Sequence, residues 1–293
     1  MLTPLFVLAR IIANPFSNVL QKKLAGGASH PLLIILVTHG LLSLVALPVL
    51  LLLHPALPGL AFWQNITICA VLAIAGNTLI VAALQNTDLS ILGPINAYKA
   101  ILSLLLGIFM LGELPSPAGL AGVALILAGS YFIMDQAPGH SGHTRLGHFL
   151  RNHGVHLRLA GLVCSATEAI FLKKALLAST PLLTFLFWCL LGLPVAGLAT
   201  WLILRNRLHA QLRALTARQP LFYLLALTTG LMQFSTLFTF GALQVGYALA
   251  LFQTSALLSV LFGYGFFQEK DILRRLTGAA IMVIGAGLIV SLG

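Results

Sequence analysis

The 293-residue sequence is 59% hydrophobic and only 8% charged, which leaves too few charges to cover a water-soluble surface of this size. The formal net charge of +10 would suit a nucleic-acid binder. The basic residues, however, fall mostly between long apolar stretches, where anionic lipid headgroups are the nearer partner. Composition and charge therefore exclude a soluble globular protein, and we expect membrane lipids rather than nucleic acid as the partner.

Ten apolar stretches are each long enough to cross a bilayer core of about 30 Å as a helix, which takes roughly 20 residues. The first is expected to be a retained helix rather than a signal peptide, because it lacks a basic leading region and Arg10 interrupts it. The predicted spans are residues 2–21, 32–53, 63–84, 91–111, 117–135, 158–177, 181–204, 221–242, 248–267 and 272–292.

The two halves of the sequence repeat each other at an offset of 156 residues. Each half holds five spans, so the second half enters the membrane from the opposite side and the repeats are expected to have inverted topology. The predicted fold is an all-α membrane protein of ten transmembrane helices in two such repeats, residues 1–135 and 158–293. The offset pairs Ser103 with Ser259, Glu113 with Glu269, Gly107 with Gly263, Gly122 with Gly278, and Gly129 with Gly285.

Two features of the repeats predict packing rather than ligand contact. Matched glycines spaced seven apart let helix backbones approach closely, which predicts a packing seam. Glu113 and Glu269 stand at equivalent helix ends, where a carboxylate can bind a nearby helix N-terminus. We expect each glutamate to be a structural cap or a gate hinge.

A polar, His-rich linker is predicted between the repeats, at residues 136–157. Two pairs of its histidines are spaced three apart and could hold a metal. No cysteine or carboxylate lies among them, so we expect a solvated linker and assign no metal or cofactor. The histidines are His140, His143, His148, His153 and His156.

Three charged residues remain near the middle of predicted spans: Arg10, Lys99 and Glu168. A charge at a helix centre costs roughly 2.5–3.5 kcal/mol on insertion scales, so such residues usually face a cavity or a partner. Polar residues follow Arg10 and flank Lys99 at the spacing of one helical face. The candidate substrate-binding residues are Arg10, Asn14, Asn18, Asn77, Asn96, Lys99, Gln233 and Gln253.

Glu168 has two open roles at this depth. A buried carboxylate can exchange protons, which would couple transport to a proton gradient. Alternatively, a salt bridge from Glu168 to Lys99 or Arg10 would serve folding alone.

The chain has two five-helix halves, and a glycine-spaced helix follows the fourth span and the ninth. Gly112 and Glu113 stand after the fourth span, and Gln268 and Glu269 stand after the ninth. In these features the chain resembles the drug/metabolite transporter superfamily, specifically its EamA-type members. The resemblance implies alternating access around a central cavity, formed largely by the first, third and fourth helices of each half. It also implies export of a small metabolite, such as an amino acid or other organic anion, by a monomer or weak homodimer.

Lys99, followed by alanine, looks like the fourth-helix lysine of sugar-phosphate and nucleotide-sugar carriers, where it meets an anionic substrate. Ser255 stands at the matching position of the second half, which counts against a phosphate clamp with basic residues from both halves. Such a carrier remains one alternative function. An integral-membrane enzyme acting on lipid-linked or small substrates is the other, although no reactive constellation of side chains is present, so we assign no catalytic residue.

The chain is expected in a bacterial inner membrane as a multi-pass protein. Cytoplasmic loops carry an excess of Lys and Arg. The loops after spans one, five, seven and nine hold twelve such residues, whereas Lys173 and Lys174 are the two on the side of the termini. The charge count therefore places both termini outside, although related transporters commonly keep both termini in the cytoplasm.

Overall fold

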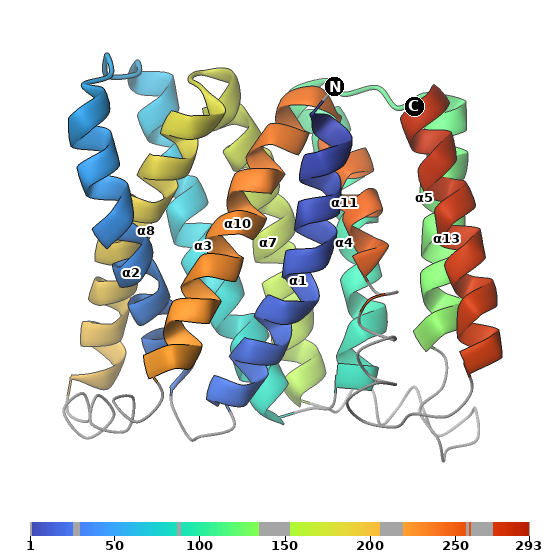
Figure 1. Ribbon diagram of the computed structural model, residues 1–293, viewed down its shortest axis with the longest axis horizontal. Helices are drawn as coiled ribbons and strands as arrows, with labels where there is room; N and C mark the ends of the chain where they lie inside the picture. Colours follow the sequence, from blue (N-terminus) through green and yellow to red (C-terminus); the bar gives the residue numbers. More distant parts are fainter. Residues whose placement is uncertain are drawn as a thin grey trace.

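The computed structural model describes residues 2–25, 30–86, 89–134, 153–205, 219–255, 258 and 272–292. Within this part of the chain the secondary structure is helical, and Figure 1 shows the helices side by side with both termini at the same end. The helices are α1 (Thr3–Ala25), α2 (Pro31–Leu53), α3 (Leu60–Asn86), α4 (Leu89–Leu111), α5 (Pro117–Met134), α7 (His153–Leu177), α8 (Pro181–Leu204), α10 (Gln219–Ala242), α11 (Val245–Gln253) and α13 (Ile272–Leu292).

The described helix starts lie close to the predicted ones, with one difference that affects the site. The helix α7 begins at His153, five residues before the predicted span, so the last part of the predicted linker is helical. His153 and His156 therefore lie on α7. His140, His143 and His148 lie outside the described residues.

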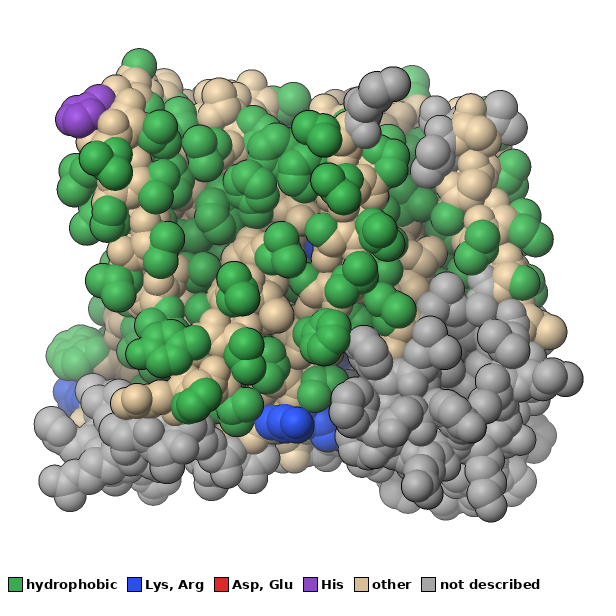
Figure 2. All heavy atoms as spheres, in the orientation of Figure 1, with side chains coloured by type: hydrophobic (Ala, Val, Ile, Leu, Met, Phe, Trp, Pro, Cys, Tyr) green, Lys and Arg blue, Asp and Glu red, His purple; other side chains and the backbone are tan. Residues whose placement is uncertain are grey.

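The outer surface of the bundle is apolar, as lipid contact requires. Six of the described helices (α1, α2, α3, α7, α8 and α10) are long and apolar enough to cross a membrane. Large side chains such as Phe109, 84% exposed, and Leu52, 80% exposed, point outward. Figure 2 shows apolar side chains over much of the visible face, with Lys and Arg at its lower end. The chain is a multi-pass membrane protein.

Local sequence signals set several helix ends. Proline occupies the first turn of α2 and of α8, where its missing N–H costs no helical hydrogen bond. His30 and Thr180 cap these two helices by accepting a hydrogen bond from a first-turn N–H. After α4, Gly112 has a φ of +67°, a conformation that glycine adopts without strain, and it turns the chain so that Glu113 leaves the helix axis.

Each major contact in the bundle joins a helix of the first half to a helix of the second. The helix α3 packs on α7, α1 on α10, α2 on α8, α4 on α11, and α5 on α13. The last pair forms one edge of the bundle (Figure 1). A Cβ atom placed on Gly122 would lie 2.7 Å from the Gly285 carbonyl oxygen, and one placed on Gly285 would lie 2.6 Å from the Gly122 carbonyl oxygen. The predicted glycine seam is confirmed at this contact.

Replacing Gly285 with Ala is expected to lower the unfolding temperature in detergent, because the new methyl group would overlap backbone atoms of α5. Such overpacking typically costs about 1–3 kcal/mol. Gly287 is the matched control: it lies two residues away on α13, and a Cβ there would meet nothing within 4 Å. If Gly287→Ala destabilised the protein as much as Gly285→Ala, the close approach of α5 and α13 would be contradicted.

Candidate functional site

A cavity of about 140 Å³ lies among the helices, lined by side chains from both halves. The structure brings eight of the nine predicted site residues to its wall. The exception is Asn96, whose side chain is outside the described residues. Their role in binding substrate stays a prediction. The eight residues are Arg10, Asn14, Asn18, Asn77, Lys99, Glu168, Gln233 and Gln253.

The helix α1 contributes one continuous polar face to the cavity. Its lining residues are spaced three or four apart, as expected for one helical face. This face runs toward the end of α1 where Lys22 and Lys23 lie, which is the end opposite the chain termini (Figure 1). The residues are Arg10, Asn14, Ser17, Asn18 and Gln21.

Arg10 is held in place by two neighbours. Its Nε donates a hydrogen bond to the Thr236 hydroxyl at 2.9 Å, and its guanidinium carbon lies 5.0 Å from the centre of the Phe252 ring, within range of a cation–π interaction. Its Nη1 atom is buried without a hydrogen-bond partner in the described structure. The fixed guanidinium therefore retains an unused donor at the cavity wall.

Glu168 lies close to several polar groups. The Cys69 thiol donates to its Oε1 at 3.5 Å, and Gln233 approaches the same carboxylate. The charges of Lys99 and Arg10 act on Glu168. Within the described residues, however, neither cation forms an ion pair with it, so the direct salt bridge considered from the sequence is absent there.

The sequence reasoning missed several lining residues, of which Arg158 is the most informative. It was counted as a loop charge, but α7 begins before it and Arg158 lines the cavity. Arg158, Ser165 and Glu168 follow the spacing of one helical face inside the predicted span, so the signal was present in the sequence. His39 and Trp188, from α2 and α8, were also missed.

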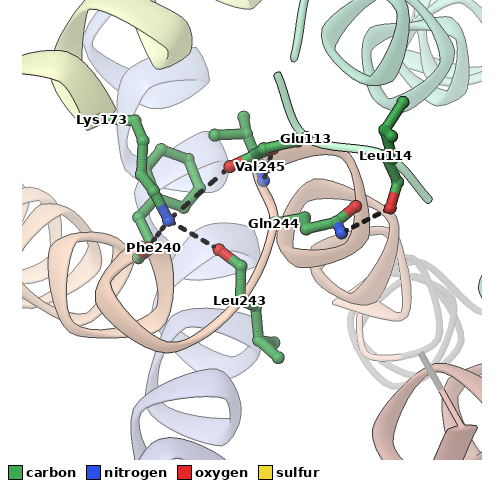
Figure 3. Close-up of polar contacts among 7 residues, drawn as sticks. All are labelled: Glu113, Leu114, Lys173, Phe240, Leu243, Gln244 and Val245. Atoms are coloured by element: carbon green, nitrogen blue, oxygen red, sulfur yellow. Dashed lines mark hydrogen bonds and ion pairs between the residues drawn. The ribbon is translucent and has the colours of Figure 1, made fainter. Parts of the chain in front are cut away.

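A network of polar contacts joins the α4–α5 turn to α7, α10 and α11 at the end of the bundle that carries the termini (Figures 1 and 3). Glu113 accepts a hydrogen bond from the Val245 N–H at 2.8 Å, which confirms the expected cap on a helix N-terminus. The Lys173 ammonium lies 3.7 Å from the same carboxylate. Lys173 also donates to the carbonyl of Phe240 and, at 3.0 Å, to that of Leu243. We call Glu113 and Lys173 the latch.

Helix dipoles explain the placement of the two latch charges. The carboxylate meets the first N–H of α11, and the ammonium meets carbonyls at the end of α10, so each charge has the sign that its helix end favours. The side chains are 11% and 14% exposed. Two further hydrogen bonds tie the α4–α5 turn to α11: Gln244 to the Leu114 carbonyl at 3.0 Å, and the Ser116 N–H to the Tyr247 hydroxyl at 2.7 Å. Glu269, the repeat counterpart of Glu113, lies outside the described residues.

An aromatic cluster lies between the cavity and this end of the bundle. The Phe6 and Phe238 rings stack with centroids 4.4 Å apart, and Phe234 contacts both. Phe6 is one turn nearer the chain terminus than Arg10 on α1. The rings therefore lie beside Arg10 on the side of the termini, the same end of the bundle as the latch.

Replacing Lys173 with Met is expected to destabilise the protein, because it leaves Glu113 and two helix-end carbonyls without their cation. For a pair this buried we expect a loss of about 2 kcal/mol or more in unfolding free energy. Lys174→Met is the matched control, since the described contact of Lys174 is with the Phe171 ring at 5.6 Å. Equal thermal stability of the two variants would contradict a structural role for the latch.

Residues 2–135 match the family model of the EamA-like transporter family. These residues belong to that family. The resemblance inferred from the sequence is therefore confirmed over the first predicted repeat, where the chain is similar to membrane transporters.

The fold of the EamA-like chain is shared with a solved protein. A structure titled "Crystal structure of protein" superposes with a TM-score of 0.67 over 98% of this chain and 95% of that chain. The identity is 16%, so the likeness shows the fold alone. No curated protein matches the sequence.

Proposed function

We propose that the chain is a secondary transporter, in which two inverted five-helix repeats give alternating access to a central cavity for a small organic anion. The observation that carries this proposal is the cavity itself. It combines Arg10, Lys99 and Glu168, drawn from both halves, on a wall that is otherwise rich in uncharged polar groups. Charges are costly inside a membrane and commonly mark substrate and ion pathways.

The helix contacts support the inverted repeat. If each helix is exchanged with its counterpart in the other half, the contact of α3 with α7 becomes that of α10 with α1. The contacts of α2 with α8, α4 with α11, and α5 with α13 each map onto themselves. A two-fold axis between the halves produces this pattern, and in inverted repeats, which many transporters have, that axis lies in the membrane plane.

The cavity supports a small, polar substrate. Drug-sized ligands usually occupy pockets of roughly 300–1,000 Å³, well above the 140 Å³ of this cavity. Its charges favour an anion, such as an organic acid or an amino acid bound through its carboxylate. A sugar-phosphate or nucleotide-sugar type of carrier is the second candidate, favoured by Lys99 on α4.

For orientation, we propose a bacterial inner membrane with the cation-rich end of the bundle in the cytoplasm and the termini outside. The polar face of α1 runs toward the cation-rich end, and the latch lies at the other. This arrangement suits entry of substrate from the cytoplasm and therefore export, as the resemblance implies. We propose a monomer or weak homodimer as the working unit.

We further propose that Glu168 couples transport to protons. An ionised Glu168 competes with the substrate anion for the charges of Arg10 and Lys99, whereas a protonated Glu168 leaves both cations to the substrate. Anion and proton would therefore travel together. Export would then be driven by an outward gradient of the metabolite itself.

An integral-membrane enzyme is the rival from another class, and counterflow separates the two. Purified protein in liposomes preloaded with an unlabelled organic acid or amino acid should accumulate the same labelled compound from outside, without any ion gradient. An enzyme or a receptor would not exchange labelled for unlabelled compound across the bilayer. Absence of counterflow for every acid that stabilises the purified protein against heat would contradict the proposal.

A further inference from the structure

The formal charges around the cavity do not balance. Among the described lining residues, Arg10, Lys99 and Arg158 are cationic and Glu168 is anionic. With all four ionised, three positive charges minus one negative charge leave a net charge of +2. A singly charged anion would leave +1, or +2 when Glu168 is protonated as in the proposed coupling, whereas a doubly charged anion would leave 0 or +1.

The three cations come from three helices and meet at the cavity. Arg10 lies on α1, Lys99 on α4 and Arg158 on α7. The charges of Arg10 and Arg158 each repel the charge of Lys99. Repulsion among like charges away from water destabilises the empty site, and an anion between them relieves it.

None of the three cations is neutralised within the described structure. Arg10 has a buried Nη1 without a hydrogen-bond partner. Lys99 feels the charge of Glu168, but neither Lys99 nor Arg158 forms an ion pair with a described residue. In contrast, the buried Lys173 is fully engaged by Glu113 and by backbone carbonyls. Lys173, which has a structural role, is thus paired, whereas the cavity cations are available to bind an anion.

The cations are also spread along the cavity. Arg158 precedes Glu168 by ten residues on α7, which places their backbones about 15 Å apart along the helix axis at 1.5 Å per residue. Arg10 is fixed by Thr236 and Phe252 at a different position on the wall. A ligand with two negative charges could therefore contact Arg158 as well as a cation near Glu168.

We propose that the cavity binds a doubly charged organic anion, a dicarboxylate or a phosphate monoester, and that Arg158 provides the preference for the second charge. Ser255, at the repeat position of Lys99, does not prevent this, because the additional cations come from α1 and α7 rather than from α11. Ser255 instead accepts a hydrogen bond from Asn14 at 2.9 Å. The inference rests on the proposed transport function and deepens it.

Two matched ligand pairs test the charge preference in detergent-purified protein. The first is succinate against succinamate, which have nearly the same shape but two charges and one. The second is methyl phosphate against dimethyl phosphate, compared at pH 8, where the first carries two charges and the second carries one. We expect at least one dianion to raise the unfolding temperature at about tenfold lower concentration than its monoanionic partner, consistent with one additional charge contact. The pair that responds distinguishes a dicarboxylate from a phosphate ester.

Two variants link the preference to Arg158. Arg158→Gln should remove most of the difference between dianion and monoanion, and Arg158→Lys should retain the difference. Equal stabilisation by both members of each pair, no stabilisation by any of the four, or an unchanged preference in Arg158→Gln would overturn the inference. Stabilisation by an amino acid zwitterion, with no stabilisation by either dianion, would also overturn the inference.

Counterflow tests the proposed transport function independently of the charge preference. It reports transport of whichever compound the cavity accepts, whatever its charge. Counterflow of a monoanion without dianion preference would overturn the charge inference and leave the transporter standing. Preferential binding of a dianion without counterflow would support the charge preference and contradict the transporter function.

Discussion

Replacing Arg10 with Gln is expected to reduce substrate binding and counterflow by about thirtyfold or more. The estimate follows from removing one partner of a desolvated charge contact, which costs about 2–5 kcal/mol. Arg10 is positioned for this contact by the Thr236 hydroxyl and the Phe252 ring, and its Nη1 is buried without a partner in the described structure. The effect should appear mainly in the affinity for substrate.

Two companion variants separate charge from geometry at Arg10. Arg10→Lys keeps the charge but loses the planar guanidinium, so we expect an intermediate loss. Thr236→Val removes the hydrogen-bond acceptor of Nε while leaving the guanidinium, and its effect should be smaller than that of Arg10→Gln. Wild-type counterflow by Arg10→Gln, with normal folding, would remove Arg10 from the proposed site.

Replacing Glu168 with Gln is expected to abolish the response of transport to a pH gradient while preserving counterflow. In wild-type proteoliposomes, substrate should move from the acidic to the alkaline compartment, because protonated Glu168 leaves Arg10 and Lys99 free for the anion. Glutamine imitates the protonated acid permanently and cannot exchange a proton. Exchange at equal pH then remains, and accumulation driven by pH disappears.

Glu113→Gln is the matched control for this result. It neutralises another largely buried carboxylate, but one that lies in the latch rather than at the cavity. The pH response should persist in this variant, even if the protein is less stable. Undiminished pH-driven accumulation by Glu168→Gln would show that Glu168 is not the coupling group and would favour a purely structural role.

The spans and much of the site could be predicted from the sequence because the membrane imposes strong physical limits. Bilayer thickness fixes the length of a crossing helix, and the cost of a buried charge restricts where Arg10, Lys99 and Glu168 can point. The helical spacing on α1 then identified neighbours of Arg10 such as Asn14 and Asn18. These residues share one wall of the cavity.

Other parts of the site depend on contacts that local patterns do not encode. Lys173 and Glu113 are sixty residues apart, and their pairing depends on how α7, α10 and α11 pack. Asn14 meets Ser255 across 241 residues. Arg158 stands at the first residue of its predicted span and was counted with the charges of the preceding loop. Tertiary packing places it at the cavity.

The central claim is that unpaired cations in the cavity bind the transported anion, and Lys99 provides its most direct test. Wild-type protein, Lys99→Ala and the control Lys174→Ala should be compared by thermal unfolding against amino acids, organic acids, phosphorylated sugars and cationic drugs. We expect anions to stabilise the wild type and Lys174→Ala, and this stabilisation to vanish in Lys99→Ala. Stabilisation by cationic drugs alone, or anion stabilisation unchanged in Lys99→Ala, would contradict the claim.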